Sequence, residues 1–413
     1  MAATFRRGRF CILQLQATAH TIMKSSTTEN EALIRHCDSA FFFSGFCYTS
    51  SGIIVSMLQE NIGFPYAVTG TLISLISVGG LIASILCGIL PSLVGLKKTT
   101  LLLSIGYTLG YLLSALTGNV FLLGVAFFII GAAKGCTLNT CNLNVGSHAK
   151  DKQRSLQAMH SCYAAGALLC PFLIEWVRKG SDRASIIAVA LVGFALWLMF
   201  FTAPLEGKTE KKKKESGGSR AFLKSLSFWL LAALLFCQNA AEISVTGWLV
   251  TYYKEQHILQ GSLASYTVTI LWAATLIGRL LMAFVIPVGN RWRTLTLMGI
   301  ACTVLYFVLM GMTEPVPACI ALFFYALAMA AVNPIIISCA GKAMTPEGMG
   351  ILLPIGTFGA IVMPAIIGAV AADNGLGAGM RCNLISCAGI TLFSILLWIR
   401  DRKESRNAAE GEA

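Results

Sequence analysis

Three ionisable residues lie inside long apolar stretches of the chain: Lys134, Glu242 and Arg279. A charged side chain at the centre of a membrane helix costs about 2.5–3.5 kcal/mol, so such a residue is presumed to be functional. The side chain of Glu242 is too short to reach water from that depth. We expect Glu242 to bind a substrate or carry a proton, with a structural ion pair as the alternative. For Lys134 and Arg279 we expect a structural or gating role, because arginine suits bidentate pairing with a carboxylate.

Amide side chains accompany Glu242. Gln238 precedes it by one helical turn and shares its face, and Asn239 lies beside that face. This segment therefore presents a polar patch, and we expect Gln238 and Asn239 to contact the substrate together with Glu242.

A second group of amides follows Lys134, at Asn139 and Asn142. Buried amides need partners, and one interpretation is that they bond neighbouring helices, at about 0.6 kcal/mol each. Asn142 has a counterpart in the second part of the chain, Asn333, which stands beside Pro334. Paired helix interruptions mark binding sites in membrane proteins built from repeats. We therefore expect Asn139, Asn142 and Asn333 to line a cavity.

Four aromatic residues could complete such a cavity. His160 and Tyr163 are three positions apart and share a helix face, and the rings of Trp248 and Trp272 are suited to stacking on a sugar. A structural role for the histidine and an interfacial role for Trp248 are the alternatives. No second histidine lies at helical spacing from His160, so we expect no metal site. The glycine-rich segments lack a phosphate-binding lysine, so we expect no nucleotide site, no cofactor and no enzyme activity.

The segments that carry these residues are strongly apolar. Hydrophobic residues make up 56% of the 413-residue chain and charged residues only 12%, against about 25% in soluble domains. Segments of 18 or more apolar residues are long enough to cross a bilayer core about 30 Å thick. We predict an all-α membrane protein with twelve transmembrane helices. The predicted spans are 39–59, 66–94, 99–116, 120–144, 155–177, 185–202, 222–253, 263–288, 295–312, 316–339, 348–371 and 383–399.

Positive charge is distributed unequally between the predicted loops. If both termini are cytoplasmic, 24 of the 31 lysines and arginines lie on the cytoplasmic side and five on the other. This asymmetry is the positive-inside pattern, so the net charge of +12 indicates orientation and not binding to nucleic acid. We expect a multi-pass protein of the plasma membrane. The fourteen cysteines contain no CxxC pair and are expected to be packing residues.

A basic stretch, residues 204–224, divides the chain into two parts with similar features at offsets of 191 to 195 positions. The repeated features are Gly52 and Gly247, Glu60 and Glu255, Gly95 and Gly289, Asn142 and Asn333, and the Gly-Ala-x-x-x-Pro strings that begin at Gly166 and Gly359. Such matches indicate an internal repeat. We predict a flexible N-terminal tail (1–36), a six-helix half (37–203), a cytoplasmic linker (204–224), a second six-helix half (225–400) and a cytoplasmic tail (401–413). Met23 is an alternative start.

Twelve helices in two halves joined by a basic linker resemble the major facilitator superfamily. The loop between the second and third predicted helices is similar to the cytoplasmic motif of that superfamily, through Gly88, Gly95, Lys97 and Lys98. Ser92 replaces the acid that is usual in this motif.

Three stretches are similar to the fucose permease-like, sugar-transporting branch of the superfamily. They are Asn142 with 160–171, 242–252, and Gly278 with Arg279. Thr49 and Leu138 stand where the fucose–proton symporters carry acids, so proton coupling by those groups is not implied.

The resemblance implies a secondary transporter whose halves rock around a site at the membrane midplane. We expect a monomer that moves a small polar solute, with sugars favoured. Proton symport through Glu242 is the expected energy source, and uniport is the alternative. In a rival interpretation, Lys134 anchors a carboxylate substrate. In another, the protein is a sensor or scaffold that does not transport, and Thr49, Leu138 and Ser92 reflect lost coupling. No selectivity sequence suggests a channel.

Overall fold

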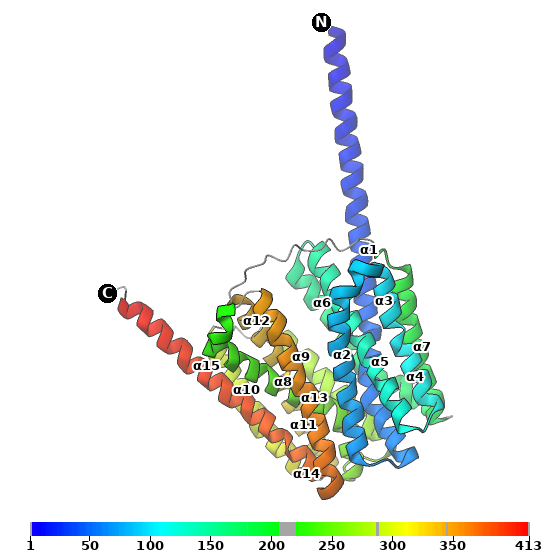
Figure 1. Ribbon diagram of the computed structural model, residues 1–413, viewed down its shortest axis with the longest axis vertical. Coiled ribbons are helices and arrows are strands. Elements are labelled where there is room, and N and C mark those ends of the chain that lie inside the picture. Colours follow the sequence, from blue (N-terminus) through cyan, green and yellow to red (C-terminus); the bar gives the residue numbers. More distant parts are fainter. Residues whose placement is uncertain (1, 180, 206–219, 286–288, 344–345, 412–413) are drawn as a thin grey trace.

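The computed structural model describes residues 2–179, 181–205, 220–285, 289–343 and 346–411. All the regular elements in these ranges are helices, and twelve spans are long and apolar enough to cross a membrane (Figure 1). The predicted number of transmembrane helices is therefore confirmed. The linker residues 206–219 lie outside the described ranges, and the predicted domain boundaries stay predictions.

The first half contains seven helical elements and the second half ten, because several spans are divided. The first half comprises α1 (Ala2–Ile62), α2 (Tyr66–Val94), α3 (Leu96–Ser104), α4 (Gly106–Leu116), α5 (Val120–His148), α6 (Lys152–Arg178) and α7 (Asp182–Thr202). The second half comprises η1 (Arg220–Lys224), α8 (Leu226–Glu255), η2 (Gly261–Tyr266), α9 (Thr267–Phe284), α10 (Arg291–Gly311), α11 (Pro315–Met329), α12 (Val332–Ala343), α13 (Pro346–Asn374), α14 (Leu376–Arg381) and α15 (Asn383–Gly411).

The N-terminal segment differs from the flexible tail expected for residues 1–36. It is the beginning of α1, which extends away from the rest of the molecule as a single helix (Figure 1). Residues 2–44 contain no proline and a single glycine, Gly8, so the sequence contains no strong signal to end the helix. The buried part of α1 begins near Leu33.

The helix pair α11 and α12 forms one span with a break at its middle. A proline has no N–H, and its ring collides with the carbonyl four residues earlier. Pro334 therefore cannot make the helical bond to the Ala330 carbonyl, and the helix breaks between Met329 and Val332. The equivalent span in the first half, α5, is continuous from Val120 to His148. The expectation of paired interruptions at Asn142 and Asn333 is therefore wrong, because the first half has no proline there.

The two halves repeat the same close helix crossing. In the first half, a Cβ atom at Gly166 of α6 would collide with the carbonyl oxygen of Phe42 in α1. In the second half, a Cβ atom at Gly359 of α13 would collide with the carbonyl oxygen of Phe236 in α8. The repeated glycines thus occupy equivalent crossings, at which only a residue without a side chain fits.

The halves contact each other through α1 with α8, α2 with α13, and α6 with α9. At the first crossing a Cβ atom at Gly52 would lie 2.7 Å from the carbonyl oxygen of Thr246, and at the second a Cβ atom at Gly70 would lie 3.1 Å from the Cα of Gly368. Both contacts lie toward the end of the molecule that carries the α1–α2 loop. The two chain termini leave from the opposite end (Figure 1).

An ionic cluster joins the halves at this same end. Glu60 of α1 accepts a hydrogen bond of 2.9 Å from Lys254 of α8 and lies 3.6 Å from Arg178 of α6. Arg178 also lies 2.7 Å from Asp182 and 3.6 Å from Glu175. The cluster therefore joins four helices from both halves: α1, α6 and α7 of the first and α8 of the second.

Candidate substrate site

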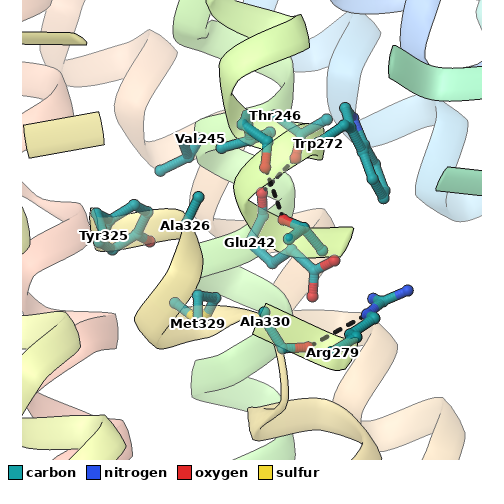
Figure 2. A pocket seen from close by; sticks show the side chains of 11 residues that line it. Glu242, Val245, Thr246, Trp272, Arg279, Tyr325, Ala326, Met329 and Ala330 are labelled. Carbon is teal, nitrogen blue, oxygen red and sulfur yellow. Dashed lines mark hydrogen bonds between the residues drawn. The ribbon is translucent and has the colours of Figure 1, made fainter. Parts of the chain in front are cut away.

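A cavity lies between α8, α9 and α11, near the middle of these helices (Figure 2). The side chains that line it are both polar and apolar: Glu242, Val245, Thr246, Leu271, Trp272, Thr275, Arg279, Tyr325, Ala326, Met329 and Ala330. Its free volume is about 20 Å³, which is room for roughly one water molecule. Anything larger requires the lining side chains to move.

A series of amide side chains leads to Glu242. Its carboxylate accepts a hydrogen bond from the Nε2 of Gln238, and the Oε1 of Gln238 accepts a bond of 2.7 Å from the Nδ2 of Asn333. The same Nδ2 also donates to the Oδ1 of Asn239 at 3.3 Å. Gln238 is fully buried. These predicted site residues therefore do lie together, and the chain of bonds connects α12 to the carboxylate on α8.

Arg279 is anchored by the break between α11 and α12. Its Nε donates to the carbonyl oxygen of Ala330 at 3.3 Å. In a regular helix that carbonyl would accept a bond from residue 334, but Pro334 has no N–H to give. The Glu242 carboxylate and the Arg279 guanidinium extend toward the same side of the cavity (Figure 2). Among the described side chains, neither of them forms an ion pair.

Lys134 brings a positive charge from the first half to the same region. Its Nζ lies 3.4 Å from the centre of the Tyr48 ring, a cation–π contact between α5 and α1. Glu242, on α8, lies within electrostatic range of both Lys134 and Tyr48. Lys134 has no ion-pair partner within the described part of the chain.

Aromatic rings from both halves meet beside the cavity. The rings of Tyr163 and Trp272 have centroids 5.6 Å apart at an angle of 61°, and His160 packs edge-on against Phe41 at 5.2 Å. Arg279 lies within electrostatic range of both His160 and Tyr163. Trp272 is 6% exposed, and its buried Nε1 has no hydrogen-bond partner. Three of the four predicted aromatic site residues are thus close together.

Trp248 lies apart from the cavity. It is fully buried, its Nε1 donates to the carbonyl oxygen of Pro364 at 3.3 Å, and its ring lies 6.3 Å from that of Tyr66 on α2. It therefore packs where the halves touch. A substrate contact by Trp248 would require the halves to separate there.

The asparagines of α5 are also outside the cavity. Asn139 donates from Nδ2 to the Oγ of Ser84 on α2 at 3.0 Å and to the carbonyl oxygen of Gly135 at 2.7 Å. The bond to Ser84 is an interhelical bond of the kind that the alternative interpretation expects, and the bond to Gly135 lies within α5. Asn142 is half-buried one turn further along α5.

The loop between α2 and α3 has the local geometry that its residues require. Gly95 has φ +90°, a conformation that residues with a side chain rarely adopt. Lys98 is exposed and Lys97 is half-exposed. The hydroxyl of Ser92, which replaces the usual acid, donates to the carbonyl oxygen of Ile89 on its own helix at 2.7 Å.

Within the described residues, no group of three metal-ligating side chains occurs.

Several cavity residues were not anticipated from the sequence. Thr246 follows Glu242 by four positions, and Thr275 lies between Trp272 and Arg279 at helical spacing, so periodicity around the charged residues could have found both. Tyr325 comes from α11, which carries no charged residue, and nothing local to that helix points to the cavity.

The comparisons with known proteins agree with this architecture. Residues 38–353 match the family model described as Major Facilitator Superfamily. The chain therefore belongs to this superfamily. It is a membrane transporter by descent and not an enzyme. A relative, the protein TsgA homolog of Yersinia pestis (strain Pestoides F), is 20% identical over 364 residues, which is 83% of this chain and 89% of that protein.

Solved structures share the fold at low identity. The nucleoside transporter NupG has a TM-score of 0.67 and 17% identity, covering 89% of this chain and 98% of its own. A D-xylose–proton symporter has a TM-score of 0.70 and 12% identity, covering 89% and 97%. A bacterial homolog of the human lysosomal transporter Spinster, in an inward-facing and occupied conformation, has a TM-score of 0.65 and 12% identity, covering 89% and 95%.

Proposed function

We propose that the protein carries a small polar solute, with sugars as the favoured class, by alternating access around the cavity of Glu242. The observation that carries this proposal is the convergence of Glu242, Arg279 and Trp272 in the middle of the molecule, next to Lys134 and Tyr163 of the other half. Polar and aromatic groups at this depth match a site for a hydroxylated ligand.

The arrangement of the halves supports alternating access. The bonds between them, such as the Glu60–Lys254 pair and the bond from Ser74 to the carbonyl oxygen of Ile361, lie toward the end of the α1–α2 loop. With cytoplasmic termini, as the positive-inside pattern favours, this is the extracellular end, so the halves are closed against each other on the extracellular side. The nearly filled cavity then widens as the halves move.

Two structural neighbours support the substrate class. NupG is described as a nucleoside transporter and another neighbour as a D-xylose–proton symporter, and both substrates contain a sugar. Residues 160–171 and 242–252 point the same way through their resemblance to the sugar-transporting branch.

Transport by purified protein in liposomes tests the proposal. We expect counterflow of labelled D-xylose or D-glucose, and an increase in net uptake when the outside is more acidic. Glu242→Gln preserves shape and hydrogen bonding but cannot exchange a proton, so we expect it to retain counterflow and to lose the response to the proton gradient.

The matched control is Glu314→Gln, because Glu314 is exposed before α11 and should behave as wild type. A Glu242→Gln variant with the wild-type pH response would show that proton coupling does not use Glu242. Absence of counterflow with every polar solute tested would support the alternative of a sensor or scaffold.

We further propose that the protein is a monomer in the plasma membrane with both termini in the cytoplasm. Protease treatment of intact cells checks the orientation, since a tag fused after Ala413 should be cut only after the membrane is made permeable.

A further inference from the structure

We propose that the preferred ligand is a hydroxylated monocarboxylate, such as a sugar acid, with its carboxylate on Arg279 and its hydroxyl groups toward Glu242 and Trp272. This inference rests on the proposed transport function and specifies its substrate class.

The charge in the central region is unbalanced. Two basic residues, Arg279 and Lys134, and one acidic residue, Glu242, lie in this region of the described structure, and none of the three forms an ion pair with a described side chain. A buried charge without a counterion is costly, and one additional negative charge would balance the group. A ligand with a single carboxylate supplies it, whereas a neutral sugar leaves the excess in place.

Arg279 has the geometry to receive that carboxylate. Its Nε donates to the carbonyl oxygen of Ala330, which restrains one edge of the guanidinium. The terminal nitrogens extend beyond this bond to the side of the cavity that the Glu242 carboxylate faces (Figure 2). A planar guanidinium binds a carboxylate through two parallel hydrogen bonds, which gives both strength and orientation.

The remaining groups favour hydroxyls over an aliphatic chain. The Nε1 of Trp272 is a buried donor that has no partner, and the residue is more than nine-tenths buried. Thr275 lies on the same cavity wall, and Glu242 is an acceptor with capacity beyond its bond from Gln238. A hydroxylated ligand can satisfy the indole donor and the carboxylate acceptor at once. A short fatty acid would leave both unsatisfied.

An amino acid zwitterion is the main competitor. Its carboxylate could lie on Arg279 and its ammonium on Glu242, but its net charge of zero would leave the Lys134 charge unbalanced. The monoanion balances all three groups, so the charges favour it.

The test compares ligands of matched size on the purified full-length protein. D-gluconate, D-glucose, L-serine and butyrate are each added in a thermal-shift titration, and each is used to compete with labelled D-gluconate in liposomes. We expect D-gluconate to bind at least ten times more tightly than D-glucose, since hydrogen bonds to a charged partner contribute about 1.5–3 kcal/mol. L-serine and butyrate should compete weakly.

Variants show whether Arg279 is the anchor. Arg279→Gln should weaken D-gluconate binding about ten-fold or more and weaken D-glucose binding much less, and Arg279→Lys should restore part of the D-gluconate binding. Arg183→Gln removes an exposed arginine and is the matched control.

The inference would be overturned if the wild type bound D-glucose and D-gluconate equally, or if L-serine or butyrate competed more strongly than D-gluconate. It would also be overturned if Arg279→Gln lost binding of D-glucose and of D-gluconate to the same extent. Counterflow of D-glucose in those cases would leave the proposed transport function intact. Transport of none of these solutes would count against both.

Discussion

At the scale of single residues, the site depends on polar side chains that hold one another. Glu242 is oriented by Gln238, and Gln238 by Asn333, so the position of a carboxylate on α8 depends on an amide from α12. Because Gln238 is fully buried, its carbonyl oxygen has no water with which to replace a lost partner.

Removal of the Asn333 amide, the last in this series, should therefore reduce the stability of the fold. We expect Asn333→Ala to reduce the free energy of unfolding by about 1–3 kcal/mol, because it leaves a buried acceptor unsatisfied. The effect is measured as a lower midpoint in thermal unfolding in detergent. Asn142→Ala, at the repeat-related position of α5, is the control and should have a smaller effect. Equal effects would contradict the role of the amide series.

At the scale of elements, the break between α11 and α12 connects a helix interruption to the site. The proline leaves the Ala330 carbonyl without its helical partner, and Arg279 bonds to it instead. The interruption is thus part of the structure that places the guanidinium.

Restoring an N–H at position 334 should disturb this arrangement. In Pro334→Ala the new N–H can bond to the Ala330 carbonyl and compete with Arg279, so we expect a more stable helix and transport reduced several-fold. Proteoliposome uptake and thermal unfolding measure the two effects. Pro354→Ala, within α13, is the control. Unchanged transport in Pro334→Ala would show that the anchor is dispensable.

The ionic cluster at the end of α1 and α8 is a second contact between elements, and it joins the two halves. Reversal of one charge, Glu60→Lys, places a new cation beside the existing cations Lys254 and Arg178. We expect it to weaken the contact between the halves by about 1 kcal/mol and to change the transport rate several-fold. The double variant with Lys254→Glu restores one pair and should recover part of the wild-type rate. A double variant no better than the single one would argue against a direct pair.

At the scale of the whole molecule, glycines at the crossings between the halves allow the halves to close against each other at the end that carries the α1–α2 loop. Gly52 of α1 lies against the backbone at Thr246 of α8, and Gly70 of α2 against Gly368 of α13. A side chain at such a crossing forces the helices apart, while the inner packing of each half is unaffected.

Gly52→Ala should therefore shift the population away from the conformation closed at this end. A Cβ atom 2.7 Å from the Thr246 carbonyl oxygen cannot be accommodated without movement. We expect faster hydrogen exchange at the adjoining ends of α1 and α8, measured by mass spectrometry. Gly146→Ala, where nothing lies within 4 Å of the new Cβ atom, should exchange as wild type. Unchanged exchange in Gly52→Ala would refute the shift.

Much of the site could be anticipated because charged and amide residues are conspicuous in apolar segments. The sequence points to Glu242 and Gln238 for that reason and to Asn333 through the internal repeat, and Gln238 is hydrogen-bonded to both of the others. Residue type and the resemblance of residues 242–252 both suggest a substrate contact for Trp248, and in the structure it is buried on α8 against Pro364 of α13 and Tyr66 of α2. Residue type does not reveal which face of a helix points to a cavity and which to another helix.

The sequence by itself determined the twelve spans, the repeated halves and the charge asymmetry, because segment length, hydropathy and loop charge are local properties of the chain. The tertiary structure decided which polar groups converge. Arg279 meets the Ala330 carbonyl 51 positions away, and Tyr163 meets Trp272 from the other half. Contacts between helices so distant in the chain depend on how the helices cross, and only the packing of the complete molecule establishes those crossings.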